Sequence, residues 1–480
     1  MDETRFDVLL ESADLAPSDF MAQQITPFKK AMNRILWGCG LCSVTLNFYA
    51  LNVILPAIGF GLCFLGFRAL KNQNIWFRAA FYTAAARTAL LWVCMILEST
   101  IFWDTLPGAQ VVQVLTWANI ALLFVMYFAL WRGLVALQRE AGLPVGAPSA
   151  FWLVVWYAVV LVLAIAGVSG TVTALLMLAA YAAIIWGLVR TSRAVDSAGY
   201  AVKPASVKIS DFWAGCILWG VLTVGVVSAN LLFGSYFMDW QPAAPGDTMN
   251  ATRAHLTNLG FPQEVLTDIQ DTDLQGLENA VLVVQNQPGD SGIAGDQENV
   301  PKVKGIAVKM NDDARDAWRI YHWFEWDEKT KFVGTECIQL WPAWRLYDGW
   351  LPSGDVSGKL YCTKDSTALM ADYCQNSTET YTSQGGFFGP YTSTDVFLTF
   401  SFGSDQTNCR GYVAYDIVQG SEGMIVDSWF NYGHQISRLQ YPAKTARQHC
   451  QSSMWDNHVF VKHQTALQFY PSDDKGVEII

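Results

Sequence analysis

Residues 190–235 read RTSRAVDSAGYAVKPASVKISDFWAGCILWGVLTVGVVSANLLFGS. A gap with four basic side chains leads directly into an apolar segment, 212–235, that is long enough to cross a bilayer as a helix. Cytoplasmic loops of membrane proteins retain positive charge. This stretch therefore predicts that the gap faces the cytoplasm and that everything after about residue 235 lies on the opposite side of the membrane.

The same alternation recurs throughout the first 235 residues. Strongly apolar segments run approximately over 32–50, 53–70, 80–103, 109–131, 151–167, 170–189 and 212–235. Nearly all basic side chains lie in every second gap between them, as Lys29, Lys30 and Arg34, then Arg68, Lys71 and Arg78, then Arg132 and Arg139, then Arg190, Arg193, Lys203 and Lys208. Each apolar segment approaches the roughly 17 to 25 residues that a spanning helix needs. The pattern predicts a polytopic α-helical membrane domain with about seven transmembrane helices.

Two pairs of these segments are separated by very few residues. The stretches 32–70 and 151–189 must each hold two short crossings, and either pair could instead be a re-entrant hairpin. The chain returns to the side where it began whether the pair crosses the membrane twice or forms a re-entrant hairpin. The predicted sidedness of the C-terminal half is therefore the same for both alternatives.

Charge divides the chain into two halves. Residues 1–235 carry 14 basic and 11 acidic side chains, whereas residues 236–480 carry 17 basic and 31 acidic ones, a net charge of −14. An acidic outer half repels polyanions, so a nucleic-acid partner is not expected. Cationic, neutral or metal-bearing partners remain open.

The N-terminal segment shows no cleavable signal peptide, because residues 1–30 contain six carboxylates and no continuous apolar core. We expect four parts. They are a cytoplasmic N-terminal tail (1–31), a seven-helix transmembrane domain (32–235), a juxtamembrane adaptor of short helices with a linker (236–301), and an extracytoplasmic mainly-β domain (302–480).

Few residues of the membrane half are candidates for chemistry. Glu98 lies near the outer end of the third span, and an ionisable residue at that depth is a candidate functional site, although a carboxylate that reaches the interface is the simpler interpretation. Cys39 and Cys42 have C-x-x-C spacing, but burial in a span favours packing over redox chemistry. Paired Gly and Pro breaks at mid-depth are missing from the spans, which disfavours solute transport by this chain alone.

The outer half changes its periodicity partway along. Leucines and other apolar residues recur at helical spacing between 250 and 280, which predicts two or three short helices. Aromatic and β-branched segments then predict antiparallel strands at 303–310, 317–326, 331–341, 357–363, 395–403, 410–418 and 424–432. Seven such strands are typical of a sandwich or jelly-roll-like fold. The segment 459–470 could be helix or strand.

The densest aromatic segment is Trp341-Pro342-Ala343-Trp344-Arg345-Leu346-Tyr347-Asp348-Gly349-Trp350. Flat rings beside fixed charges suit a sugar-binding or peptide-binding surface. The candidate binding residues are Trp341, Trp344, Arg345, Tyr347, Asp348 and Trp350. The alternative is that these rings fill the core, since Trp is usually largely buried.

Cysteines and histidines of the outer half give no diagnostic pattern. Cys337, Cys362, Cys374, Cys409 and Cys450 are odd in number, so at most two intrachain disulfides can form, and the partners stay open. All six histidines lie beyond residue 250, without the spacing of a zinc site. We therefore predict neither a metal site nor a cofactor.

Together these features favour a receptor-like or partner-binding membrane protein of the cell membrane. Its outer β domain would bind an extracytoplasmic ligand or protein, and its helices would serve as anchor or coupler in the lipid bilayer. Any signal would need a separate intracellular partner, because no nucleotide-binding output domain is predicted. The alternatives are a membrane-embedded enzyme that uses Glu98, and an accessory subunit of a transporter or envelope-assembly complex.

Overall fold

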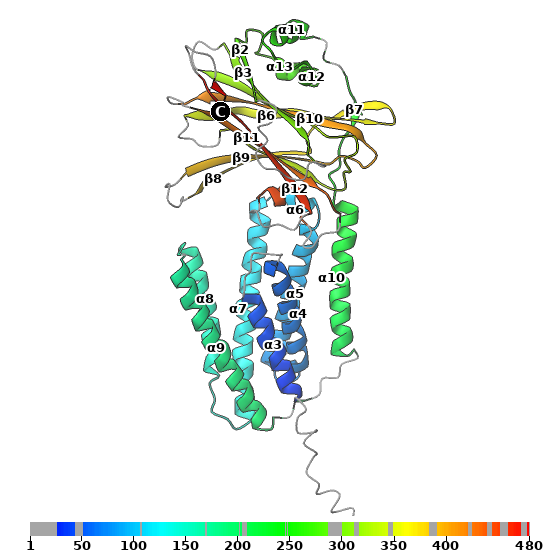
Figure 1. The fold of residues 1–480 in the computed structure, drawn as a ribbon. Helices are drawn as coiled ribbons and strands as arrows, with labels where there is room; N and C mark the ends of the chain where they lie inside the picture. The colour runs from blue at the N-terminus through cyan, green and yellow to red at the C-terminus, as the bar shows by residue number, and fades with distance from the viewer. Residues whose placement is uncertain are drawn as a thin grey trace, which may run out of the picture. The chain divides into compact units, whose positions relative to one another are not determined.

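The structure is a computed structural model, which describes residues 26–43, 51–105, 108–168, 170–200, 202–203, 209–244, 246, 248–286, 300–311, 316–343, 349–383, 391–420, 425–438, 444–451, 459–471 and 478–479. The predicted N-terminal tail lies almost wholly outside these residues. The described residues form two compact units: one within 1–94 and 107–224, and one within 95–106 and 225–480. Figure 1 shows the chain coloured along its length.

Six helices of the described residues are long and apolar enough to cross a membrane. They are α4 (Leu51–Leu70), α5 (Ile75–Glu98), α7 (Gly108–Glu140), α8 (Pro148–Ile165), α9 (Thr171–Ser197) and α10 (Asp211–Phe233). Their length and composition are compatible with membrane insertion. The predicted tight pair at 151–189 consists of α8 and α9, each of which meets the length criterion alone.

The count of seven spans is not confirmed. The predicted first span, 32–50, overlaps α3 (Pro27–Ser43), which begins earlier and includes Lys29, Lys30 and Arg34. Residues 44–50 lie outside the described residues. The described part of this helix therefore carries more basic residues than the predicted apolar segment does.

Helices α3 and α4 approach each other closely because glycine lies at their contact. A Cβ added at Gly38 would lie 2.6 Å from the carbonyl oxygen of Gly59, and one at Gly59 would lie 2.8 Å from that of Gly38. Small residues allow such close approach between helices in lipid. Nearby, the buried Arg87 of α5 donates from Nε to Asn119 Oδ1 of α7 at 3.0 Å and lies over the ring of Phe60. Asn119 is thus engaged within the helical unit.

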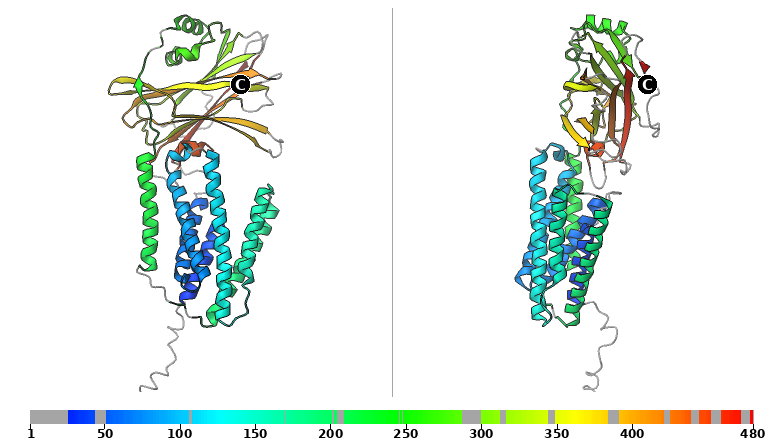
Figure 2. Two further views of the ribbon diagram at one scale, coloured as in Figure 1. Left: turned by 180° about the vertical axis from the view of Figure 1, so that it is seen from behind. Right: turned by 90° about the vertical axis from the view of Figure 1, so that its left-hand side faces the viewer.

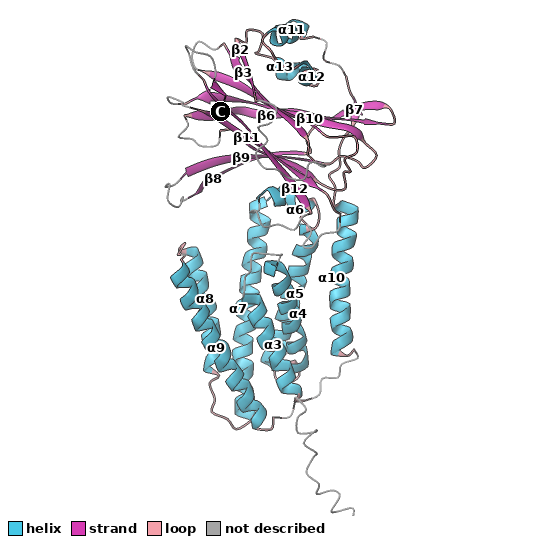
Figure 3. Cartoon of the chain, viewed as in Figure 1, coloured by secondary structure: helices cyan, strands magenta, loops and turns pink. Residues whose placement is uncertain are grey.

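The C-terminal region is mainly β, as predicted, and contains two antiparallel sheets (Figure 3). The first, sheet A, has the order β1-β7-β6-β10-β4-β3-β2. Its strands are β1 (Gln241–Pro242), β2 (Leu282–Gln285), β3 (Lys302–Met310), β4 (Ala317–Glu325), β6 (Trp350–Lys364), β7 (Thr367–Ala371) and β10 (Thr407–Gln419). The pair β1–β7 joins the segment that follows α10 to the edge of this sheet.

The second, sheet B, has the order β13-β12-β11-β5-β9-β8. Its strands are β5 (Glu336–Trp341), β8 (Gln375–Ser383), β9 (Tyr391–Phe400), β11 (Val426–Gln435), β12 (Phe460–Tyr470) and β13 (Glu478–Ile479). The ambiguous segment 459–470 is therefore a strand. The short helix α14 (Ala446–Gln451) packs on one face of this sheet through Ala446 and Cys450.

One hydrophobic core joins side chains of both sheets. Trp318, Ile320 and Phe324 of β4 pack in the same buried cluster as Phe430 and Tyr432 of β11. Figure 2 shows the same strands from two further sides. A second cluster lies on the opposite face of sheet A, where Tyr321, Trp323 and Tyr412 meet apolar residues of three short helices. These helices are α11 (Asn250–Asn258), α12 (Gln263–Leu266) and α13 (Asp271–Leu274).

Candidate binding groove

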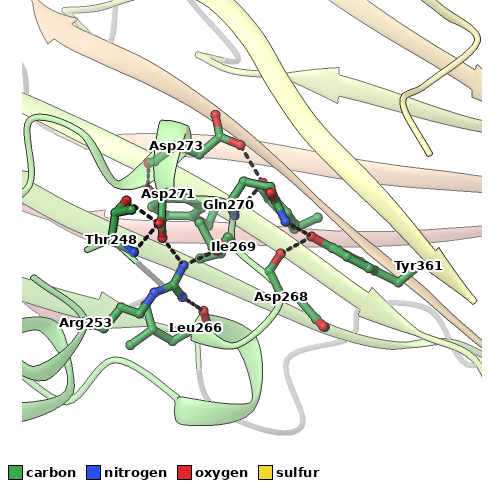
Figure 4. A network of polar contacts seen from close by, with 11 residues as sticks. Thr248, Arg253, Leu266, Asp268, Ile269, Gln270, Asp271, Asp273 and Tyr361 are labelled. Carbon is green, nitrogen blue, oxygen red and sulfur yellow. Dashed lines mark hydrogen bonds and ion pairs between the residues drawn. The ribbon is translucent and has the colours of Figure 1, made fainter. Parts of the chain in front are cut away.

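A polar network, here called the helix clamp, fixes the segment 248–275 to sheet A (Figure 4). At its centre, the buried Asp268 accepts hydrogen bonds from Trp323 Nε1 at 2.8 Å and from Arg410 Nε at 2.9 Å. Tyr361 of β6 donates to the Asp268 carbonyl oxygen, and its own hydroxyl oxygen accepts from Gln270 Nε2 at 2.8 Å. The clamp thus fixes the C-terminal part of β6 to the short helices that cover this face of sheet A.

A second part of the helix clamp closes the segment on itself. Arg253 donates to the carbonyl oxygen of Ile269 at 2.7 Å and to Asp271 Oδ1 at 2.7 Å. Asp271 also accepts from the backbone N–H and the hydroxyl of Thr248. These hydrogen bonds, with the Arg253 charge, lower the pKa of Asp271 to about 2. The carboxylate is therefore ionised throughout the physiological range.

The carboxylates of the helix clamp form hydrogen bonds and ion pairs with other groups of the protein. Asp273 accepts from the Tyr412 hydroxyl, and Glu264 pairs with Lys302 and Lys304. Asp268, Asp273 and Glu264 therefore act as structural partners of sheet A, whereas Asp271 bonds within the segment itself. These carboxylates therefore do not form a binding site for a cation.

We expect Asp268→Ala to loosen the helix clamp. The change removes the acceptor of a buried indole N–H and the partner of Arg410, which costs about 2 kcal/mol of docking free energy. Limited proteolysis within 246–280 is expected to be about 30-fold faster, because cleavage follows the population of the open form. Glu278→Ala, an exposed position on the same segment, serves as control and should cleave at the wild-type rate. Equal cleavage of both variants would contradict this role of Asp268.

A groove of about 210 Å³ lies beside the helix clamp at the edge of sheet A. Three segments line it: the residues just after α10, Lys359 of β6, and the end of β7 with the turn that follows. The lining residues are Phe237, Met238, Asp239, Gln241, Lys359, Met370, Ala371, Asp372, Tyr373 and Cys374. The pairs Gln241–Met370 and Tyr361–Met370 fix these segments relative to one another.

The groove combines acidic and apolar side chains. Asp372 forms an ion pair with Lys359, whereas Asp239 is exposed and accepts a 3.2 Å hydrogen bond from Gln241 Nε2. Phe237 is exposed, and Tyr373 donates its hydroxyl to the Tyr412 carbonyl oxygen at 3.0 Å, which fixes its ring. Carboxylates beside aromatic and thioether surface suit a ligand group that is cationic and partly apolar.

The predicted aromatic binding segment is only partly visible. Trp344, Arg345, Tyr347 and Asp348 lie outside the described residues. Trp341 is half-buried at the end of β5, with its ring 6.3 Å from that of Trp429. Trp350 is buried in the core at the start of β6, so its ring is not open to a ligand here. Binding by this segment stays a prediction.

Glu98 lies at a helix end. It is the last residue of α5, half-buried, and within electrostatic range of Lys444. This position fits a carboxylate at the end of a span, and its catalytic role stays a prediction. Within the described residues, no group of three or more His, Cys, Asp or Glu side chains is arranged to hold a metal ion.

Comparison with known proteins gives little. No family model matches the chain, and no curated protein matches it. Among solved structures, the chain is similar to a protein described as "Pore forming protein" (TM-score 0.20, 5% identity, 41% of this chain, 93% of that chain). It is also similar to Clostridium perfringens delta-toxin (0.21, 6%, 41%, 91%) and to the Clostridium perfringens NetB toxin in its membrane-inserted form (0.15, 8%, 41%, 100%). Similarity at these TM-scores supports no inference about a shared fold or activity.

Proposed function

We propose that this chain is a receptor-like integral membrane protein that binds a cationic, partly apolar ligand or protein segment in the groove beside the helix clamp. The long apolar helices indicate membrane association. The observation that carries the binding proposal is the groove itself, in which Asp239 and Asp372 lie beside Phe237, Met238 and Met370.

The sidedness of the site is part of this proposal. Clusters of Lys and Arg in every second gap predict that the C-terminal half lies outside the cytoplasm, and the same half has a net charge of −14. An acidic region attracts cationic partners over long range and raises their association rate. Charge on the domain and charge in the groove therefore favour the same class of ligand.

The helix clamp supports the proposal by making the groove rigid. Tyr361, which the clamp holds, lies two positions from Lys359 on the same strand. A preorganised site loses less conformational entropy when a ligand binds. The clamp would thereby raise the affinity of the groove without touching the ligand.

Binding can be tested on the full chain in lipid nanodiscs with a Lys-Trp-Lys peptide as probe and Glu-Trp-Glu as the matched acidic peptide. We expect only the cationic peptide to bind. Asp239→Asn should weaken binding about 5-fold, because a partly exposed charge contact contributes about 1 kcal/mol. Asp372→Asn should weaken it at least as much, because it also leaves Lys359 without its partner.

Asp355→Asn is the control for net charge. Asp355 is exposed on β6 and does not line the groove, so this change removes the same charge from the same region. Its affinity should equal that of the wild type. Equal weakening by all three variants, or equal binding of both peptides, would contradict a cation site in the groove.

The wider role follows from the same arrangement. Ligand capture outside would be coupled through the helices to a separate intracellular or transporter partner, which stays a prediction. The enzyme based on Glu98 and the accessory subunit remain the alternatives. Co-purification with a transport ATPase, without any peptide binding, would favour the accessory subunit.

A further inference from the structure

The fold brings four of the five C-terminal cysteines together in two pairs. Cys337 lies on β5 and Cys450 on α14, and both belong to one small buried cluster. Cys362 lies on β6 and Cys409 on β10, and both belong to the core between the sheets. All four are free thiols in this structure.

The first pair lies close together in the fold. The thiols of Cys337 and Cys450 interact within one buried cluster, although the two residues are far apart in the sequence. Gly433 of β11 is paired with Cys337 across the sheet. A Cβ at Gly433 would lie 2.7 Å from Cys450 Sγ, so only glycine leaves room for that sulfur beside Cys337. The absence of a side chain at Gly433 thus allows the Cys450 sulfur to lie against the face of sheet B.

The second pair is formed by a β-bulge between neighbouring strands. Thr407 pairs with Thr363 and Arg410 pairs with Tyr361, so Asn408 and Cys409 together oppose Cys362. Asn408 adopts φ +51°, a left-handed conformation that Asn tolerates. Neighbouring antiparallel strands hold opposed Cα atoms about 4.5 to 5.5 Å apart. This spacing lies within the range that a disulfide requires.

We infer that Cys337–Cys450 and Cys362–Cys409 are disulfide bonds in the mature protein and that Cys374 remains a free thiol. The first bond fastens α14 to sheet B. The second joins β6 to β10, two strands of the sheet that carries the groove. Cys374 has no cysteine neighbour in these clusters and lines the groove.

The inference rests on the extracytoplasmic location in the proposed function, because disulfides persist on the oxidising side of a membrane. Each bond forms when two thiols release two protons and two electrons. The electrons reduce the disulfide of a thiol–disulfide oxidoreductase to its dithiol, through a mixed disulfide. Burial raises the pKa of the Cys362 thiol to about 12, so this pair must react before the core closes.

The test maps cysteine pairing in the full chain. Cells are quenched in acid, the protein is denatured and alkylated with and without reductant, and the peptides that contain the five C-terminal cysteines are read by mass spectrometry. We expect only Cys374 to be alkylated before reduction and all five after it. Peptides that link Cys337 to Cys450 and Cys362 to Cys409 should disappear on reduction.

Variants sharpen this result. Cys450→Ser should make Cys337 alkylatable without reductant and leave the Cys362–Cys409 peptide intact, whereas Cys374→Ser should change neither linked peptide. Alkylation of all five cysteines before reduction, or any other pairing, would overturn the inference.

A second measurement separates failure of this inference from failure of the proposed sidedness. Cys374 is exposed, so a membrane-impermeant maleimide should label it on intact cells. Labelling of Cys374 with four free thiols elsewhere would refute the disulfides and leave the sidedness intact. If Cys374 is labelled only after lysis, the sidedness fails, and the disulfides fail with it.

Discussion

Glu336→Ala is expected to lower the free energy of unfolding of the C-terminal region by about 3 to 5 kcal/mol. Both carboxylate oxygens of Glu336 lie 2.9 Å from His434 Nδ1, and both side chains are buried. His434 is enclosed by aromatic rings, with Trp326 at 4.7 Å and Phe332 at 5.4 Å between ring centroids. Loss of the carboxylate would leave a polar ring in an apolar cage without its partner.

Burial also determines the ionisation of this pair. Burial raises the pKa of Glu336, and the His434 ring opposes that shift. Glu336→Gln keeps the shape and an oxygen acceptor, so we expect it to lose less than half as much stability as Glu336→Ala. Glu328→Ala, an exposed position that follows β4, should be close to neutral.

The measurement is chemical unfolding of the full chain in detergent, followed by near-UV circular dichroism, which reports the packed aromatic rings of the C-terminal region. Denaturation midpoints should fall in the order wild type, Glu336→Gln, Glu336→Ala. A midpoint for Glu336→Ala equal to that for Glu328→Ala would show that the Glu336–His434 pair does not stabilise the core.

His322 should make the C-terminal region sensitive to mild acid. Its ring is fully buried between the sheets, stacks on Phe430, and contacts the Tyr415 hydroxyl and Ser428 Oγ through Nε2. Burial lowers its pKa from 6.5 to about 3. The unfolded chain therefore takes up a proton near pH 6.5 that the folded chain takes up only near pH 3. Stability is complete above pH 6.5 and is lost as the pH falls between these values.

The expected loss from His322 alone is about 3 kcal/mol between pH 7 and pH 4, from about 1.4 kcal/mol per pH unit below 6.5. Carboxylates also titrate in this pH range. The stability of the wild type must therefore be compared with that of His322→Phe at each pH. Phenylalanine keeps the stacking on Phe430, and Tyr415 and Ser428 remain hydrogen-bonded to each other. The difference in stability between the two proteins should shift by about 3 kcal/mol in favour of the variant as the pH falls. Parallel curves would contradict a neutral buried His322.

Much of the β region could be predicted because its strands show their periodicity. The segments around β3, β4, β10 and β11 alternate apolar with polar residues or are rich in aromatic residues, and each is a strand within a few residues of the prediction. By contrast, β8 reads QNSTETYTS and is polar on both faces, so it carries no apolar signal. It lies at the edge of sheet B, where one side needs no partner strand.

Trp350 shows why the aromatic segment was hard to interpret. Pro352 and Gly354 follow it and read as a turn, yet the structure places all three in β6. Strand β7 pairs with β6 only from Leu360 onward, so the first half of β6 has one open edge that tolerates a proline. Register with Gln419 of β10 then directs Trp350 into the core.

The groove could not be found from sequence because residues 237–241, which follow α10, are far along the chain from the hairpin of β6 and β7 that supplies the rest of its lining. Asp239, Lys359 and Asp372 are brought together by the order β1-β7-β6, and β1 is only two residues long. A two-residue strand has no recognisable period. The acidic excess of the C-terminal half was the one signal that pointed to a cationic ligand.

The location of residues 236–480 is the central claim, and protease shaving of intact cells tests it most directly. With an epitope tag after Ile480 and a second tag before Met1, we predict that external protease removes the C-terminal tag from intact cells and leaves the N-terminal tag until lysis. Survival of the C-terminal tag on intact cells, with its loss only after lysis, would contradict the account.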